Sequence, residues 1–325
     1  MKKLRKFLTI LTTVLVVIAV SWFIISLIPP KAAVEGDNPW RKTDQTLISA
    51  HRGGANLNPE NTEMAFDYVI NETTYTDIVE IDIRVTKDNE LVIIHDDSIN
   101  RTGIKGEVDN DNLQIINNLY YKDLLQYNLG VNFEKDGVKP YENLTVAEAE
   151  EKGLTIMRFE DFLIKYQSSR YFRLLLEIKD SKKLGVKAVD LAEEIIAKHA
   201  DWDERIMIIS FSTDVVNHVL ANYKDRYVAG MGYNMVTFLI GSVLNLDCLF
   251  NIKYQSVQSS MITKAGPISI DCATQSFVDS AHARNQCVAF WTINEEADMR
   301  YLVSLGVDVI TTNSPDVLAK VLGKI

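Results

Sequence analysis

The chain has 325 residues, of which 47% are hydrophobic and 24% are charged. This composition supplies enough apolar material for a sizeable core and argues against a disordered or fibrous protein. The formal net charge is −10, although residues 1–6 alone carry four basic side chains, so the rest of the chain is more acidic still. Because an acidic body repels the phosphate backbone on which nucleic-acid affinity depends, we do not expect nucleic-acid binding.

The N-terminal segment, residues 1–30, predicts a membrane anchor. Residues 7–28 contain no charged side chain, and this run of 22 is longer than the apolar region of a signal peptide. Cleavage near Ala33 would place Lys31 where a small residue is needed. Because the basic cluster before the run should stay in the cytoplasm, we predict a single-pass protein of the cell membrane with its catalytic domain on the extracellular side. A cleaved signal peptide and a buried core helix are the alternatives.

Residues 31–45 are polar and contain Pro and Gly, so we interpret them as a linker to a domain that spans residues 46–325. In this domain short apolar runs alternate with amphipathic stretches, which predicts strands followed by helices. The expected strands are 47–50, 78–85, 91–95, 172–178, 206–211, 227–231, 254–257, 288–292 and 307–311.

This alternation predicts an α/β fold, and its length fits a (β/α)8 TIM-type barrel. Two places interrupt the pattern. The turn between Val85 and Leu91 is too short for a crossover helix, which leaves the relative direction of its two strands open. Residues 98–157 are polar with weak periodicity, so we interpret them as an insertion after the third strand. An open doubly wound sheet is the alternative, but no glycine-rich nucleotide-binding motif follows the first strand.

The three cysteines, Cys248, Cys272 and Cys287, are too few for a disulfide framework, and their spacing matches no zinc pattern. One disulfide with one free thiol is an alternative that their number allows. We expect three buried thiols that pack as small apolar side chains.

Side chains suited to catalysis concentrate where the expected strands end. His51 and Arg52 follow the first strand and supply a proton-transfer group and a planar cation that suits phosphate. Glu80 and Asp82 are two positions apart in the second strand, so both carboxylates point to the same face. His95 ends the third apolar run. Parallel strands of a barrel end on one face, where barrel enzymes build their active sites.

The fourth expected strand adds Glu177 and Lys179 on one face. Together with Glu80 and Asp82, this gives three carboxylates with no Cys or His between them, which suits Ca²⁺ or Mg²⁺ better than zinc. Taken singly, a strand-end histidine is more often structural and a Glu-x-Asp pair is more often a solvated strand face. Their joint occurrence at equivalent places in successive strand units favours an active site.

The other three histidines, His199, His218 and His282, lie on segments with helical periodicity. We expect each of them to be a structural residue. They therefore provide an internal comparison for His51 and His95, which follow strands.

At this point the sequence resembles the glycerophosphodiester phosphodiesterase family, which belongs to the phosphatidylinositol-phospholipase-C-like barrel class. The resemblance runs from Leu47 to about Ala319, and ordered motifs at consistent spacing carry it. These motifs are His51-Arg52-Gly53, Pro59-Glu60-Asn61-Thr62, Glu80-x-Asp82, His95-Asp96, Arg101-Thr102, Glu177-x-Lys179, Phe290-Trp291-Thr292 and Thr312-Asn313-x-Pro315-Asp316.

The resemblance implies metal-dependent hydrolysis of glycerophosphodiesters to sn-glycerol 3-phosphate and an alcohol. It assigns acid–base catalysis to His51 and His95, and it leaves open which of them is the acid. It also implies that Arg52 binds phosphate, with Lys179 as a second cation and Trp291 on the glycerol side or in the core. The implied metal ligands are Glu80, Asp82 and Glu177. The expected cofactor is one divalent cation, with Ca²⁺ favoured outside the cell and Mg²⁺ as the alternative.

Two other functions remain as alternatives to this reading. One is a phospholipase of the same barrel class, and the other is a non-catalytic protein that binds glycerophosphate polymers. The complete set of three acids and two histidines favours the glycerophosphodiesterase. The expected partners are a small glycerophosphodiester or a polyglycerol-phosphate polymer, together with the membrane through the N-terminal helix.

Overall fold

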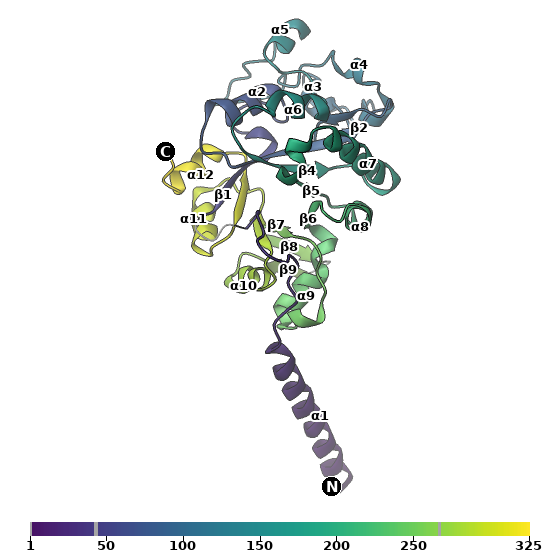
Figure 1. The fold of residues 1–325 in the computed structure, drawn as a ribbon, viewed down its shortest axis with the longest axis vertical. Coiled ribbons are helices and arrows are strands. Elements are labelled where there is room, and N and C mark those ends of the chain that lie inside the picture. The colour runs from purple at the N-terminus through teal and green to yellow at the C-terminus, as the bar shows by residue number, and fades with distance from the viewer. Residues whose placement is uncertain (1, 42–44, 266–267) are drawn as a thin grey trace.

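Eight parallel strands close into a barrel in the computed structural model, which describes residues 2–41, 45–265 and 268–325 (Figure 1). The strands are β1 (Leu47–Ala50), β2 (Ile78–Val85), β4 (Arg173–Ile178), β5 (Ile206–Ile209), β6 (Tyr227–Gly230), β7 (Ser256–Ser259), β10 (Cys287–Phe290) and β11 (Val309–Thr312). Closure is complete because β1 pairs with both β11 and β2. The predicted TIM-type barrel is therefore confirmed, and the doubly wound alternative is wrong.

The short turn after β2 produces a β-hairpin. Strand β3 (Leu91–Ile93) runs antiparallel to the end of β2, with Val85 opposite Leu91 and Ile83 opposite Ile93. At the centre of the turn, Asn89 has a φ of +67°, a conformation that Asn tolerates better than most residues. Because β1 pairs only with the start of β2, the end of β2 is free to bind β3 instead.

The helices that follow the strands cover the outside of the barrel (Figure 1). In α7, for example, Ala188, Val189, Ala192 and Ile196 are buried against the barrel. These outer helices and helical turns are α2 (Glu63–Asp67), η2 (Tyr68–Glu72), α6 (Phe159–Tyr166), α7 (Lys182–Lys198), η4 (Ala200–Arg205), α8 (Thr213–Asn222), η5 (Gly232–Met235), α9 (Val236–Leu244), η6 (Asp247–Leu249), α10 (Gln275–Ala283), α11 (Glu296–Ser304) and α12 (Pro315–Val321).

The segment after β3 is folded around a small apolar cluster of its own that includes Ile99, Ile116, Leu124 and Leu129. Its helical elements are α3 (Asn100–Gly103), η3 (Ile116–Asn118), α4 (Tyr121–Leu124) and α5 (Val146–Glu151). A second addition, the antiparallel hairpin of β8 (Ile262–Ala265) and β9 (Ile268–Asp271), was not predicted from the sequence.

Part of the expected linker is packed against the barrel. The Trp40 side chain is 1% exposed and lies at the end of the barrel where the strands begin, next to the Tyr227 ring and 5.6 Å from the Arg173 guanidinium. Asn38 donates hydrogen bonds to the backbone carbonyls of Gln255 and Asn285. These contacts anchor the segment to the amino end of the barrel, which its polar composition did not suggest.

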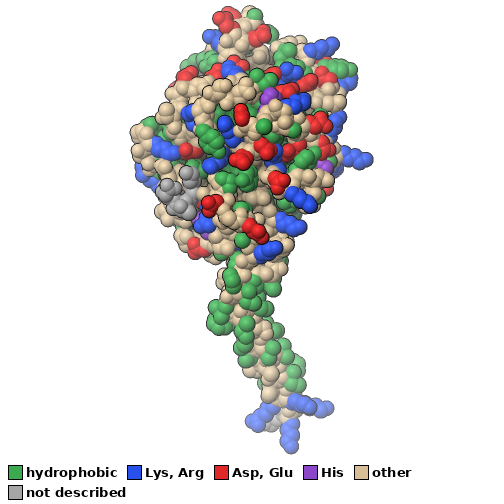
Figure 2. All heavy atoms as spheres, in the orientation of Figure 1, with side chains coloured by type: hydrophobic (Ala, Val, Ile, Leu, Met, Phe, Trp, Pro, Cys, Tyr) green, Lys and Arg blue, Asp and Glu red, His purple; other side chains and the backbone are tan. Residues whose placement is uncertain are grey.

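The N-terminal helix α1 (Lys2–Ser26) projects away from the barrel and buries none of its side chains (Figure 1). Hydrophobic side chains surround it along its length, and basic residues gather at its free end (Figure 2). The buried-core alternative is therefore wrong. By length and composition the helix could cross a membrane.

Candidate active site

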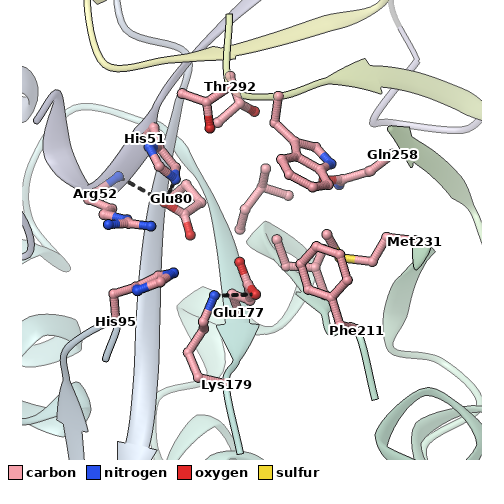
Figure 3. Close-up of a pocket in the computed structure, with 14 residues that line it drawn as sticks. His51, Arg52, Glu80, His95, Glu177, Lys179, Phe211, Met231, Gln258 and Thr292 are labelled. Atoms are coloured by element: carbon pink, nitrogen blue, oxygen red, sulfur yellow. Dashed lines mark hydrogen bonds and ion pairs between the residues drawn. The ribbon is translucent and has the colours of Figure 1, made fainter. Parts of the chain in front are cut away.

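The structure brings all eight predicted site residues together at the carboxyl end of the barrel. Seven of them line one pocket (Figure 3), which has a volume of about 110 Å³. Asp82 is fully buried next to Glu177. The seven are His51, Arg52, Glu80, His95, Glu177, Lys179 and Trp291.

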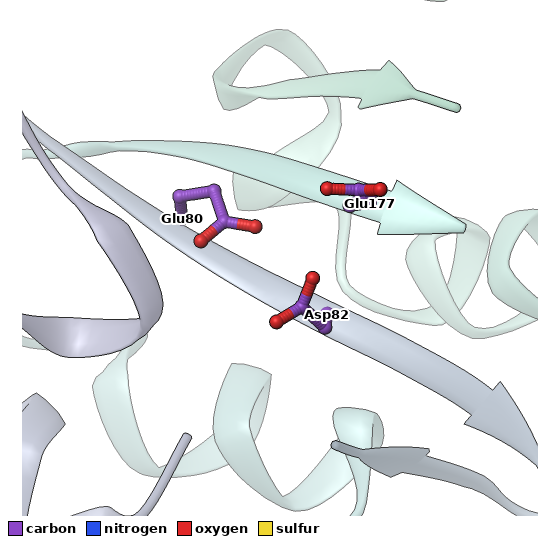
Figure 4. A group of neighbouring side chains, drawn as sticks. All are labelled: Glu80, Asp82 and Glu177. Atoms are coloured by element: carbon purple, nitrogen blue, oxygen red, sulfur yellow. The ribbon is translucent and has the colours of Figure 1, made fainter. Parts of the chain in front are cut away.

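The three acids form a compact cluster, and two of them, Glu80 and Glu177, line the pocket. Glu80 and Asp82 project from the same face of β2, and strand pairing sets Asp82 beside Glu177 of β4 (Figure 4). One carboxylate oxygen from each residue lies within 4.8 Å of the other two. Their side chains are almost completely buried, so the three negative charges have little help from water.

The pKa values of the three carboxyl groups shift in different directions. Burial raises the pKa of Glu80, and the nearby charges of Asp82 and Glu177 raise it further. Burial and Asp82 likewise raise the pKa of Glu177. Burial also opposes ionisation of Asp82, but the positive charges of Lys179 and Arg52 outweigh that effect and lower its pKa. A bound cation would relieve the repulsion between these carboxylates.

The donors in the cluster fit a hard divalent cation. Glu80 Oε1 and Asp82 Oδ1 are buried and have no hydrogen-bond partner among the described residues. Such buried acceptors are unfavourable unless another group satisfies them. All the donors are carboxylate oxygens, which Ca²⁺ and Mg²⁺ prefer. Lys179 partly offsets their charge, because its Nζ lies 2.7 Å from Glu177 Oε1 and 3.5 Å from Asp82 Oδ1.

Arg52 is fixed next to the acids by its backbone and its side chain. Its φ of +53° turns the chain sharply after β1, and its backbone N–H donates to Glu80 Oε2 at 2.8 Å. The guanidinium lies 3.2 Å from Asp82 Oδ2 and 3.0 Å from Glu60 Oε1. With both carboxylates holding it, the planar cation is oriented at the pocket before any ligand arrives.

His51 has one ring nitrogen engaged and one exposed to the pocket. Its Nδ1 lies 2.6 Å from Asn313 Oδ1, and because an amide oxygen only accepts, Nδ1 must donate. Nε2 is then the free nitrogen, 4.0 Å from Glu80 Oε2. Burial and the adjacent Arg52 charge lower the pKa of His51 to about 4, so the ring is neutral at pH 7.

A chain of hydrogen bonds and ion pairs orients His95. Its Nδ1 lies 2.6 Å from Asp96 Oδ1, and Asp96 Oδ2 accepts from Arg101 Nε at 2.5 Å. Arg101 also donates to both oxygens of Glu60, the carboxylate that contacts Arg52. Burial opposes ionisation of Asp96, but hydrogen bonds from His95 and Arg101 outweigh that effect and lower its pKa. The network therefore links the orientation of His95 to that of Arg52.

The opposite wall of the pocket is mostly apolar. It includes Ile209, Phe211, Met231 and Trp291, of which Figure 3 labels Phe211 and Met231. The Phe211 and Trp291 rings meet edge to face, with 5.4 Å between their centroids. Trp291 Nε1 is buried without a hydrogen-bond partner among the described residues. Trp291 therefore packs against Phe211 and also contributes to the surface of the pocket.

The sequence did not assign roles to several residues that support the site. They lie within the quoted motifs, but nothing in the sequence indicates which side chain each would contact. These residues are Glu60, Asn61, Asp96, Arg101 and Asn313. Asn61, for example, donates to Asp82 Oδ2 at 2.8 Å.

The three remaining histidines lie outside the pocket and pair with acids elsewhere. His218 Nε2 lies 2.6 Å from Asp190 Oδ1, and His282 Nε2 lies 2.8 Å from the buried Asp308. His199 lies 3.6 Å from Glu160. Cys272 and Cys287 are buried free thiols as expected, whereas Cys248 is only half-buried.

Comparison with known proteins gives a consistent result. The model of the glycerophosphoryl diester phosphodiesterase family matches residues 51–317. A glycerophosphodiester phosphodiesterase of Bacillus altitudinis is 25% identical over 284 residues, which cover 85% of this chain and 98% of the relative.

Solved structures share the fold. The glycerophosphoryl diester phosphodiesterase domain of a Mycobacterium tuberculosis protein superposes with a TM-score of 0.65 at 18% identity, covering 87% of this chain and 100% of that one. An Oleispira antarctica phosphodiesterase, solved in complex with the product sn-glycerol-3-phosphate, has a TM-score of 0.59 at 18% identity, covering 86% of this chain and 97% of that one.

Proposed function

Because the chain belongs to the glycerophosphoryl diester phosphodiesterase family, we propose that it converts glycerophosphodiesters to sn-glycerol 3-phosphate and an alcohol at the carboxyl end of its barrel. The observation that carries this proposal is the convergence of two histidines and two cations on the buried acid cluster. A protein that only binds phosphate has no need of two proton-transfer groups next to such a cluster.

Arg52 and Lys179 bind the phosphodiester. Their positive charges border the pocket, and Glu60, Asp82 and Glu177 hold them in fixed orientations. The phosphate gains negative charge as the attacking oxygen approaches, so pre-oriented cations stabilise the transition state more than the substrate.

The two histidines divide the proton transfers. His51 is neutral at pH 7 and presents Nε2 to the pocket, so it accepts the proton of the attacking oxygen. His95, held by Asp96 through Nδ1, donates a proton from Nε2 to the leaving alkoxide. In the net reaction, the P–O bond to the leaving alcohol breaks and one water molecule is consumed. The products are the alcohol and sn-glycerol 3-phosphate.

Glu80, Asp82 and Glu177 would hold one divalent cation. When bound, such a cation acts as a Lewis acid that withdraws charge from the phosphate oxygens. We favour Ca²⁺, with Mg²⁺ as the alternative, because a cluster of carboxylates on two strands tolerates the larger and less regular shell of Ca²⁺.

The proposed location follows from α1. We propose that α1 crosses the cell membrane once and that the barrel lies on the extracellular side, because the basic residues precede the apolar run. An enzyme in this position would meet deacylated phospholipids or polyglycerol-phosphate polymers. Protease added to intact cells should then digest the barrel and spare the basic N-terminus.

The direct test of the reaction uses the purified full chain and glycerophosphocholine. We expect choline and sn-glycerol 3-phosphate to form in equal amounts. If the chain is only a polymer-binding protein, neither product forms, and any glycerophosphocholine is at most bound stoichiometrically. Running phosphatidylcholine and polyglycerol phosphate in parallel would identify the preferred substrate. A clear preference for intact lipid would favour the phospholipase alternative.

A further inference from the structure

Helix α9 presents an apolar face that the fold of the barrel leaves uncovered. Residues 227–246 contain no charged side chain, and α9 is the centre of this stretch. The exposed fraction is 65% for Val243, 47% for Leu244 and 44% for Ile240. These residues recur at helical spacing and so share one side of the helix. Leu249, in the adjoining η6, is 60% exposed and extends the surface.

This surface lies beside the proposed membrane helix, which contacts the end of α9 and η6 without covering the exposed side chains. In Figure 1, α9 is at the lower end of the barrel next to α1, and the insertion with α5 is at the opposite end. The Trp22 Nε1 donates a hydrogen bond to the carbonyl oxygen of Leu244 at 2.8 Å, and the Cys248 thiol lies 3.4 Å from the carbonyl oxygen of Ile25. The apolar face of α9 therefore continues the apolar surface of α1.

The position of Trp22 in α1 sets the depth of this contact. A hydrocarbon layer of about 30 Å takes up roughly 20 helical residues. If it begins after Lys6, the last basic residue of the N-terminal cluster, it ends near Ser26. Trp22 is four residues before that end, about 6 Å along the helix axis. A group bonded to Trp22 is then at the outer boundary of the bilayer, where tryptophan is enriched.

We propose that the exposed face of α9 and η6 lies in the outer leaflet of the membrane and contacts lipid directly. This face is defined as Ile240, Val243, Leu244 and Leu249. Lipid is the occupant that the structure favours, because the face is uncharged and continuous with a helix suited to a bilayer. The barrel would then rest on the membrane along this side rather than move freely on a tether.

The test uses the full chain reconstituted in phosphatidylcholine vesicles, with a single environment-sensitive fluorophore. Cys248→Ser removes the half-buried thiol, and a cysteine is then introduced in place of Ile240 or Val243. Ile164→Cys, on α6 and 49% exposed, is the matched surface control, and Val14→Cys in α1 is the control for insertion. Circular dichroism and thermal unfolding of each labelled chain check that it is folded, and turnover of glycerophosphocholine is measured separately.

We expect lipid-attached quenchers to reduce the fluorescence of the labels at positions 240, 243 and 14. Aqueous iodide should quench the label at position 164 several-fold more than it quenches those three labels. If the α1 label is quenched from the lipid but those at 240 and 243 respond like the label at 164, the proposal is wrong. It is equally wrong if mixed donor- and acceptor-labelled chains show energy transfer at 243 without lipid quenching, because a second copy then covers the face. A loss of turnover with normal quenching would count against the proposed reaction and leave this inference standing.

Discussion

One wall of the pocket is charged and the other is mostly apolar. On the wall formed by β1, β2 and β4, buried carboxylate oxygens of Glu80 and Asp82 have no hydrogen-bond partner among the described residues. On the wall formed by β5, β6 and β10, apolar side chains such as Phe211 and Trp291 already contact each other. The first wall presents carboxylate oxygens that suit a divalent cation, and the second presents an apolar surface. Catalysis should therefore depend mainly on the charged wall and substrate fit on the apolar wall.

We expect the largest loss of activity when a histidine of the charged wall is replaced. We expect His51→Ala and His95→Ala each to lower kcat by about 10²-fold or more, the usual scale for an acid–base group. Steady-state kinetics with glycerophosphocholine, together with circular dichroism to verify folding, measures this. Near-normal kcat in either variant would remove that histidine from the mechanism.

A somewhat smaller loss is expected from the network behind the charged wall. Glu60→Gln keeps the shape of the side chain but removes the charge that Arg52 and Arg101 share. We expect kcat/KM to fall roughly 10–100-fold, the range seen when residues that orient metal-site groups are changed. Unchanged kinetics would show that Arg52 is oriented well enough by Asp82 alone.

The apolar wall should respond differently. For Trp291→Ala we expect kcat/KM to fall by roughly tenfold, mainly through a higher KM, because the variant loses contact area and no group that transfers protons or charge. Comparing kcat and KM separately with those of Glu60→Gln is the measurement. A loss confined to kcat would show that the apolar wall contributes to catalysis and not mainly to substrate fit.

The protonation of His51 provides a test that needs no substrate. NMR titration of the metal-free protein should give a midpoint of about 4 for this imidazole. Because this pKa is below the unfolded value of about 6.5, the unfolded state binds more protons between these values. His51 therefore lowers the stability of the fold as pH falls from 6.5 towards 4. A midpoint at or above 6.5 would contradict the burial argument.

The smallest effect is expected outside both walls. His282→Ala should leave turnover nearly unchanged, because His282 contacts Asp308 and not the pocket. Thermal unfolding can report any loss of stability from the broken contact separately. A loss of kcat as large as that in His51→Ala would undermine the distinction between strand-end histidines and the others.

The barrel and the positions of the main site residues could be predicted because they depend on local patterns. Glu80 and Asp82 share a face by strand periodicity, and His51 follows its strand directly. The partners of these residues could not be predicted in the same way. Arg101 and Glu60 meet across 41 positions of sequence, and only the folded insertion brings them together. The packing of Trp40 could not be predicted either, because a lone tryptophan in a polar segment does not indicate where its side chain is buried.

Removal and return of metal tests the central claim most directly. Chelated enzyme, verified by elemental analysis, should lose turnover of glycerophosphocholine, and added Ca²⁺ or Mg²⁺ should restore it. Glu80→Gln should require more added metal for the same recovery, because it removes one charged donor from the cluster. Full turnover by exhaustively chelated enzyme in which no metal is detected would contradict the metal assignment and favour a metal-free phospholipase mechanism.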